Sequence, residues 1–292
     1  MLINKPISYL NLSTNKAIVP NSSRNYSQIA FGKTDFDSFE KTKISPNQAT
    51  VENSIESFAE KLYEQFDNNT FSTENLRNLI KEFSPRTKLK HEKNNHFSAL
   101  HISNQHFSKH KNKFYYGKDK ILVNTDKFEN KKSTLFIDII HEMIHHLQKN
   151  ENETSYINIL NDYINSDPEQ KLDKDTLIQI TNGGCFLVVN TVENYYSLRG
   201  KTLQQELNTE LIKALKDIKT DDKQTCGKLL LKMALLATKT EIEAYDVSTK
   251  ITKKYFPQYN TKHDDILKET YEKLSHNIEN LLKELSKQDR KR

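Results

Sequence analysis

The chain is poor in residues that characterise several classes of protein. Its 292 residues include no Trp, two Cys, six Gly and six Pro. Cys185 and Cys226 are too few for a disulfide framework and too far apart for a Cys-x-x-Cys site, which favours a reducing compartment. No apolar run reaches the length of about 18 residues that a membrane-spanning helix needs, so no integral membrane segment is expected. The first residues lack the basic start and apolar stretch of a secretory signal. We expect a cytoplasmic protein, with export by a route without a classical signal peptide as the alternative.

Charge is abundant but nearly balanced. The chain has 44 basic and 39 acidic residues, a formal net charge of +5, and 35% hydrophobic residues. This composition favours helices with solvated faces around a modest interior. The small excess of positive charge is not gathered into a basic patch with aromatic residues, so no nucleic-acid partner is expected.

One stretch, residues 135–148 (LFIDIIHEMIHHLQ), combines chemical and apolar residues at helical spacing. At about 100° per residue, His141, His145 and Asp138 share a narrow face of a helix, and Glu142 lies beside them. The rest of the circumference is apolar, with Phe136, Ile137, Ile139, Ile140, Met143, Ile144 and Leu147. The pattern predicts a buried helix with one polar face.

That polar face suits a metal ion. Two histidines at i and i+4 can offer ring nitrogens to one ion, and the adjacent Glu142 can reach a water molecule on it. A chance occurrence of the motif, or a structural helix with core histidines, is the alternative. Burying these histidines with two carboxylates is costly without a cation, which favours the metal site.

The segment HEMIH resembles the active-site helix of the zincin metallopeptidases. The resemblance implies that His141 and His145 bind Zn²⁺ and that Glu142 is the general base. The metzincin extension would require Gly at position 148 and His at position 151, where this chain has Gln148 and Glu151. The Asp-x-x-Tyr pattern of the aspzincins is absent too. The gluzincin arrangement remains, in which a glutamate on a later helix completes the site.

The third ligand is predicted on a later helix. The segment Glu241-Ile-Glu243-Ala-Tyr is similar to the Glu-x-Glu-Ala segment of several gluzincin-like families, where the glutamate before the alanine is the ligand. We therefore predict Glu243 as the third zinc ligand. Glu241 is the second choice, and Glu193, nearer in the sequence, is the third.

Further side chains are candidates for supporting roles. Ligating imidazoles usually donate their second N–H to a carboxylate or carbonyl, so Asp138 and Asp246 are expected near the ligands. His146 borders Glu142 and either assists it or points to solvent. Three tyrosines are candidate oxyanion donors without a preference among them: Tyr195, Tyr196 and Tyr245.

The chain divides into a leader and one domain. Residues 1–48 are rich in Asn, Ser, Lys and Thr and lack sustained periodicity, so we expect a mostly disordered leader. Residues 49–292 are expected to form the zincin-like domain. Helical periodicity occurs in the ranges 51–66, 76–83, 203–215 and 229–246, and in an amphipathic C-terminal helix, 267–285, expected to pack on its own domain rather than in a dimer.

A β-hairpin is expected before the HEMIH helix. The apolar runs 114–116 and 121–123 flank a turn that contains Gly117. Zincins place an antiparallel edge strand beside the active-site helix, where an extended peptide can bind as an added strand. By that resemblance, 121–124 is the candidate edge strand. His101, His106 and His110 precede the helix at irregular spacing and are expected in solvent.

Together these patterns predict an α+β fold that is predominantly α-helical, with a zincin-like catalytic core and a small antiparallel hairpin or sheet before the active-site helix. The expected function is a zinc-dependent metallopeptidase that hydrolyses peptide bonds of a peptide or protein substrate. The alternative is a catalytically inactive helical interaction protein with a relic or structural metal site. The sequence leaves the substrate and the oligomeric state open.

Overall fold

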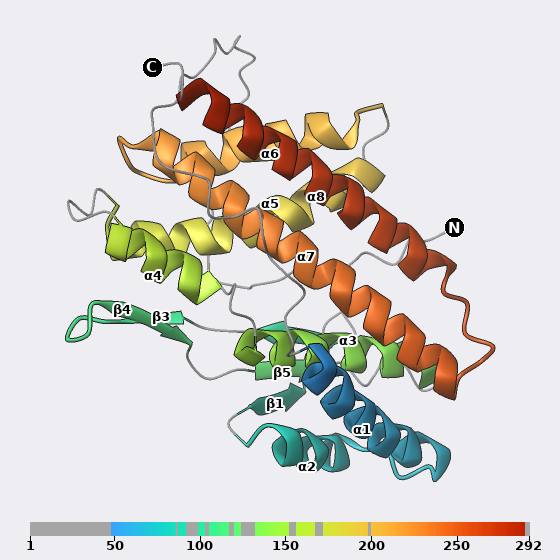
Figure 1. Ribbon diagram of the computed structural model, residues 1–292. Helices are drawn as coiled ribbons and strands as arrows, with labels where there is room; N and C mark the ends of the chain where they lie inside the picture. The colour runs from blue at the N-terminus through green and yellow to red at the C-terminus, as the bar shows by residue number, and fades with distance from the viewer. Residues whose placement is uncertain are drawn as a thin grey trace.

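The computed structural model in Figure 1 describes most of the chain from residue 48 onwards. The described ranges are 48–85, 87–91, 99–102, 105–116, 120–123, 132–151, 156–166, 172–197 and 200–289. The leader expected at 1–48 lies outside them except for its last residue. The described part is predominantly helical with a small sheet, which confirms the coarse fold class.

Helices account for most of the described residues. They are α1 (Gln48–Asp67), α2 (Thr73–Phe83), α3 (Lys132–Glu151), α4 (Tyr156–Ser166), α5 (Lys174–Ser197), α6 (Leu203–Asp217), α7 (Lys223–Tyr255) and α8 (Lys262–Asp289). The strands are β1 (Lys88–His91), β2 (Ala99–Ile102), β3 (Gln105–Ser108), β4 (Lys113–Tyr116) and β5 (Lys120–Val123). In the part of the chain described, none of the helices combines the length and the apolar character needed to span a bilayer.

Local sequence signals set several helix ends. Thr202 and Gln205 form a capping box at the start of α6, in which each side chain bonds the other's backbone N–H. At the start of α7, the Asp222 carboxylate accepts a hydrogen bond from the backbone N–H of Thr225. The same helix ends at Tyr255, two residues before Pro257, whose ring cannot continue it.

The strands pair differently from the expected hairpin. The three-stranded sheet has the order β1-β5-β2, with β1 parallel and β2 antiparallel to β5, and Ala99 opposite Val123. The strands β3 and β4 form a separate antiparallel pair, with Phe107 opposite Phe114. The predicted hairpin between 114–116 and 121–123 is therefore wrong, because β4 pairs with β3 and β5 with two other strands.

The role of β5 also differs from the prediction. Ile121, Leu122 and Val123 are all buried, the pattern of a strand covered on both faces, and β5 lies at the centre of its sheet. The prediction of an edge strand at 121–124 is wrong for 121–123, and Asn124 lies outside the described residues. The strand beside α3 is β2, whose outer edge pairs with no described strand.

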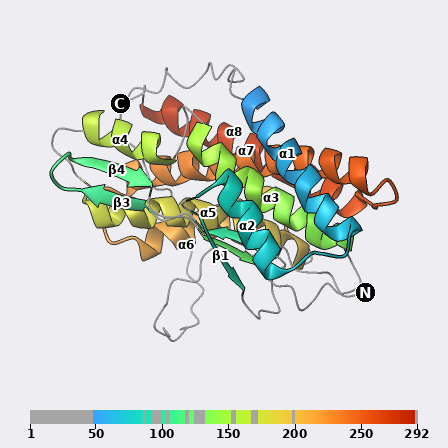
Figure 2. The same ribbon diagram turned by 90° about the horizontal axis from the view of Figure 1, so that it is seen from below.

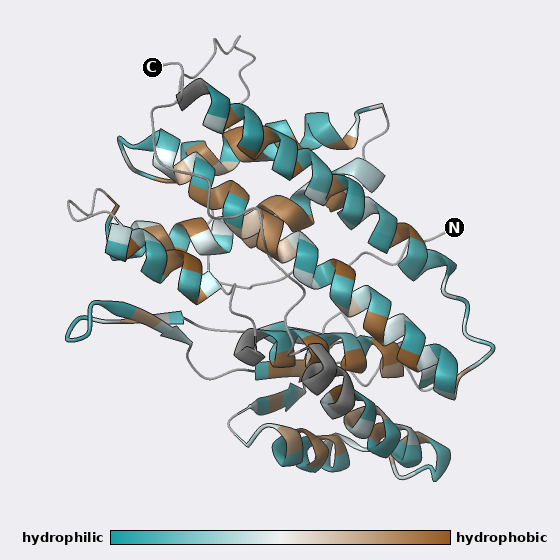
Figure 3. Cartoon of the chain, viewed as in Figure 1, coloured by the Kyte–Doolittle hydropathy of each residue, from teal (hydrophilic) through white to brown (hydrophobic). Residues whose placement is uncertain are grey.

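Three clusters of buried residues form the core, and α7 contributes to all of them. The first joins α1, α2, the three-stranded sheet, α3 and the later part of α7. The second joins β4, α4, the end of α6 and the starts of α5 and α7, and the third joins α5, the start of α6, α7 and α8. Hydrophobic segments gather where α5 and α7 cross, and hydrophilic residues cover the outer face of α8 (Figure 3). The C-terminal helix packs on its own domain, as predicted, through Leu267, Tyr271, Leu274 and Ile278.

The layering brings α3 and α7 together. In Figure 1, α3 lies between α7 above and the sheet below, and the view from below in Figure 2 places α2 and the sheet in front of α3. α3 packs directly against α7. Residues about 100 positions apart in the sequence can therefore meet there.

A glycine sets the spacing of α5 and α7. A Cβ atom on Gly184 would lie 2.4 Å from Cβ of Met233 and 3.1 Å from the backbone N of Ala234. A Cβ on the neighbouring Gly183 would lie 2.9 Å from Cδ2 of Leu230, the far end of a flexible side chain. Only the first position requires the absence of a side chain.

We predict that Gly184→Ala lowers the free energy of unfolding by about 1–2 kcal/mol. The overpacking outweighs the gain of roughly 1 kcal/mol from the higher helix propensity of alanine. Thermal and denaturant unfolding measure the change. Gly183→Ala is the matched control and should leave the stability equal or slightly higher. Equal stability of the wild type and Gly184→Ala would contradict the close approach of α5 and α7.

Candidate metal centre

Three side chains from α3 and α7 converge on one point. His141 and His145 lie one turn apart on α3, and their Nε2 atoms are 3.0 Å apart. From α7, Glu241 places Oε2 3.2 Å from Nε2 of His141 and Oε1 3.3 Å from Nε2 of His145. In the described ranges, these residues form a group whose donor atoms could hold one metal ion.

The donor set and its spacing fit zinc. Ligand atoms about 2.0–2.1 Å from a tetrahedral Zn²⁺ lie roughly 3.3 Å from one another. The three distances between Nε2 of His141, Nε2 of His145 and the Glu241 oxygens are 3.0, 3.2 and 3.3 Å. Two histidines and one glutamate are also a ligand set of catalytic zinc sites, which keep a fourth position for water. The residues therefore fit a zinc ion with one open position.

The third residue of the group is Glu241, not the predicted Glu243. Oε2 of Glu243 accepts a hydrogen bond of 2.9 Å from Nε2 of Gln148 instead. Residues two positions apart on a helix point about 200° away from each other, so Glu241 and Glu243 cannot both face the same histidines. Glu193, the other alternative, lies on α5 and is not part of the group.

Apolar packing against α3 sets the rotation of α7 about its axis. Ala244, Val247 and Ile251 of α7 are buried in the same cluster as the apolar residues of α3. Glu241 is three residues before Ala244 and therefore lies on the face of α7 that packs against α3. Apolar packing thus selects the glutamate that meets the histidines.

Glu142 lies beside the group in a fully buried position. Its Oε2 accepts a hydrogen bond of 2.7 Å from the backbone N–H of His101 on β2. Its Oε1 is buried and accepts no hydrogen bond from the residues that the structure describes, an arrangement that is costly for an ionised carboxylate. Burial raises the pKa of Glu142 to about 8, and the charge of His145 only partly offsets this.

The surroundings shift the pKa values of the two buried glutamates in opposite directions. Burial alone would raise the pKa of Glu241, but the charge of His145 and hydrogen bonds to both histidines hold that pKa far below its usual range. Burial alone would lower the pKa of His145, but the charge and hydrogen bond of Glu241 raise it to about 9. Burial lowers the pKa of His141. Glu241 is therefore an anion, whereas Glu142 can hold a proton near neutral pH.

Of the residues predicted to support the ligands, Asp138 and His146 are half-buried or buried, whereas Asp246 is exposed. Asp138 is half-buried on α3, and its charge is one of the causes that raise the pKa of Glu142. Asp246 is exposed, and its Oδ1 accepts a hydrogen bond of 2.6 Å from Nζ of Lys268 on α8. This contact does not support the predicted role of Asp246 beside a ligand. His146 is buried rather than in solvent.

Among the three tyrosines, Tyr245 lies nearest to the group. Its ring centroid is 4.5 Å from that of His141, and burial raises its pKa well above the usual value. The hydroxyl of Tyr196 bonds Oγ1 of Thr270 at 2.5 Å, and Tyr195 is exposed. The geometry therefore favours Tyr245 over the other two as a neighbour of the site.

Two residues near the site were not expected there. His101 was expected in solvent, but it is buried on β2 with its ring centroid 5.7 Å from that of His146. Nothing in the sequence pattern points to it. Gln148 bonds the ring of His145, and its position three residues later, on the same helix face, is a signal that could have identified it. His110 is exposed as expected, and the side chain of His106 is not described.

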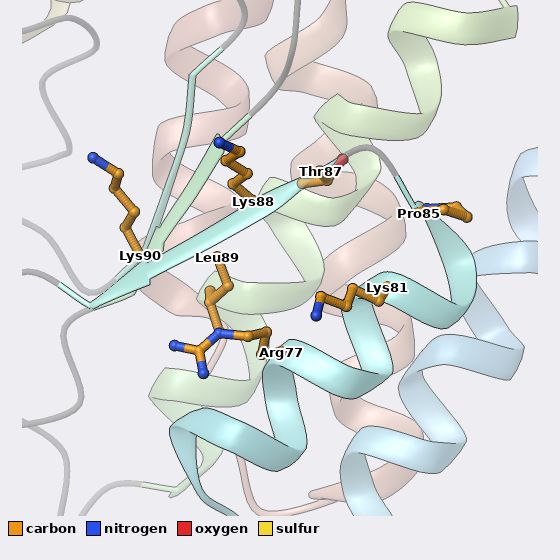
Figure 4. Close-up of a pocket in the computed structure, with 7 residues that line it drawn as sticks. All are labelled: Arg77, Lys81, Pro85, Thr87, Lys88, Leu89 and Lys90. Atoms are coloured by element: carbon orange, nitrogen blue, oxygen red, sulfur yellow. The ribbon is translucent and has the colours of Figure 1, made fainter.

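A separate pocket of about 530 Å³ lies between α2 and β1 (Figure 4). The described residues of its lining carry four cations and include none of the ligand types of the metal centre, histidine and carboxylate. β1 is an edge strand of the three-stranded sheet, on the side opposite β2. Lysines on such an edge strand oppose its pairing with other chains. The lining residues are Arg77, Lys81, Pro85, Thr87, Lys88, Leu89 and Lys90.

The electrostatics predict that protein stripped of metal by a chelator loses stability between pH 6 and pH 9. His145 has a folded pKa raised to about 9, so its stabilisation is present below the unfolded value of 6.5 and is lost as the pH rises toward 9. Glu142 also binds more protons in the folded state, because its pKa is raised from 4.5 to about 8. The expected loss is on the order of 1–3 kcal/mol.

Thermal unfolding across this pH range measures the loss. His145→Gln is the control and should show a flatter profile, because it removes one of the two titrating groups. A wild-type profile no steeper than that of the variant would contradict the assignment.

Comparison with protein-family models, with curated proteins and with solved structures finds no match for this chain. The resemblance to zincins therefore rests on the HEMIH segment itself. Any assignment of function depends on the geometry of His141, His145, Glu241 and Glu142.

Proposed function

We propose that the protein is a zinc-dependent peptidase of gluzincin type, with a zincin-like core built around α3. The observation that carries the proposal is the convergence of His141, His145 and Glu241 at distances of 3.0–3.3 Å, with the buried Glu142 beside them. His141, His145 and Glu241 would hold the ion. When bound, Zn²⁺ would supply a Lewis acid for a carbonyl and lower the pKa of water toward about 7.

Glu142 is assigned the proton transfer. Burial raises its pKa to about 8 in the metal-free site, and the charge of a bound Zn²⁺ would lower that pKa, so that the carboxylate can accept a proton near neutral pH. Oε1 takes a proton from water as the water oxygen bonds to the scissile carbonyl carbon. The same group then gives this proton to the leaving amine as the C–N bond breaks. The backbone N–H of His101 fixes Oε2 and so aims Oε1.

The edge of β2 is the proposed place for the substrate. An extended peptide can add to an open sheet edge through main-chain hydrogen bonds. Support comes from two features: β2 packs on α3, and no strand within the described ranges pairs with its outer edge. The His101 hydrogen bond to Glu142 connects this edge with the proposed base.

A rival function is that of a helical interaction protein with a structural metal. The depth of the site favours it, because Glu142 is fully buried and His141 is only 7% exposed. However, a structural site has no use for a carboxyl group like Glu142, whose complete burial is a cost to the fold. The peptidase proposal gives that carboxyl group a role.

We predict that Glu142→Gln retains zinc binding and loses hydrolysis of unstructured peptides by about 10²–10⁴-fold, because general acid–base catalysis contributes that much. Zinc content by elemental analysis and cleavage of a mixed peptide library followed by mass spectrometry provide the two measurements. Glu64→Gln, at an exposed position on α1, is the matched control and should keep the activity.

Two results would count against the proposal. Full activity of Glu142→Gln would refute the assigned base. One bound zinc in a wild type that cleaves no peptide in the library would favour the structural-metal protein.

A further inference from the structure

Gln148 occupies the contact between α3 and α7. It is 3% exposed and lies three residues after His145, on the same face of α3. Its side-chain amide contacts both helices. Oε1 is 3.0 Å from Nδ1 of His145, and Nε2 is 3.2 Å from the backbone O of Thr240 and 2.9 Å from Oε2 of Glu243.

The two contacts with α7 fix the orientation of this amide. A backbone carbonyl such as that of Thr240 only accepts hydrogen bonds, and Oε2 of Glu243 accepts the second one, so the amide presents its NH₂ group to α7. Its oxygen then faces His145, where it can only accept. When His145 is neutral, as a metal ligand must be, Nδ1 is therefore its protonated nitrogen, and the lone pair on Nε2 points toward His141 and Glu241.

The same amide also sets the position of Glu241. Thr240 precedes Glu241 and Glu243 follows it by two residues, so the contacts of Gln148 flank this ligand along α7. A shift of α7 along α3 would break both hydrogen bonds. Gln148 therefore links the turn of α3 that carries His145 to the turn of α7 that carries Glu241.

We propose that Gln148, oriented by Glu243, is the positioning residue of the metal centre, which fixes the tautomer of His145 and the placement of Glu241. The inference rests on the proposed zinc site. It places Glu243 behind the ligands: its carboxylate accepts a hydrogen bond from Nε2 of Gln148, whose Oε1 contacts Nδ1 of His145. Neither residue touches the ion.

The first test is Gln148→Leu, which keeps a similar size and removes all three hydrogen bonds. Zinc affinity, measured by competition with a chromophoric chelator, should fall about 10–100-fold, the usual effect of losing a partner behind a ligand. Gln179→Leu, at an exposed position on α5, is the matched control and should bind zinc like the wild type. Circular dichroism of both variants checks that they fold.

The second test is a charge exchange. Gln148→Glu alone places two carboxylates about as close as the present 2.9 Å contact and should weaken zinc binding. Adding Glu243→Gln returns an NH₂ donor to the carboxylate at position 148, which still accepts from Nδ1 of His145. The double variant should recover most of the affinity, although both single changes weaken it.

The rescue by the double variant separates positioning from general destabilisation, because a merely destabilised fold would not be restored by a second substitution. Zinc affinity of Gln148→Leu within twofold of the wild type, or a double variant no better than Gln148→Glu, would overturn the positioning role and leave the zinc site standing. A wild type that binds no zinc would refute the proposed function, and the positioning role with it.

Discussion

The burial of three ionisable side chains between two apolar helices is the constraint on which the rest of the structure depends. His141, His145 and Glu241 lie where α3 packs on α7, and isolated charges there would be strongly unfavourable. The long helix α7 secures this contact because it takes part in all three buried clusters. The approach of α5 at Gly184 and the packing of α8 hold α7 from its other sides. A helix anchored along its whole length can present one glutamate at a defined height and rotation.

Around this contact, one residue type performs three tasks because the environments differ. Glu241 faces two histidines and remains an anion, whereas Glu142 faces a backbone N–H and apolar surroundings that raise its pKa to about 8. Glu243 lies farther out and orients Gln148. Environments that push the pKa values of neighbouring carboxyl groups apart are typical of sites that separate charge stabilisation from proton transfer. Here the three environments are created by two helices and the edge of a short sheet.

The sequence predicted the local part of this site and missed the part that depends on packing between helices. His141, Glu142 and His145 follow from one helix and its periodicity, and they lie as expected. The choice between Glu241 and Glu243 depends on the rotation of α7, which Ala244, Val247 and Ile251 set by packing on α3. The apolar spacing of these residues was present in the sequence, but similarity to a short motif outweighed it. The predicted strand pairing was wrong for a related reason. Residues 121–123 are apolar at every position, which indicates a central strand, whereas the partner strand β1 carries alternating lysines and lacks an apolar run that would mark it.

The measurement that tests the account most directly is equilibrium dialysis against Zn²⁺ of the wild type, Glu241→Ala and Glu243→Ala at matched, saturating metal. The account predicts one zinc per chain in the wild type and in Glu243→Ala, and loss of the tightly bound ion in Glu241→Ala, because Glu241, and not Glu243, belongs to the group of described residues that could hold the ion. Retention of zinc by Glu241→Ala with loss in Glu243→Ala would contradict the geometry of the site. A wild type without bound zinc would contradict the central claim itself.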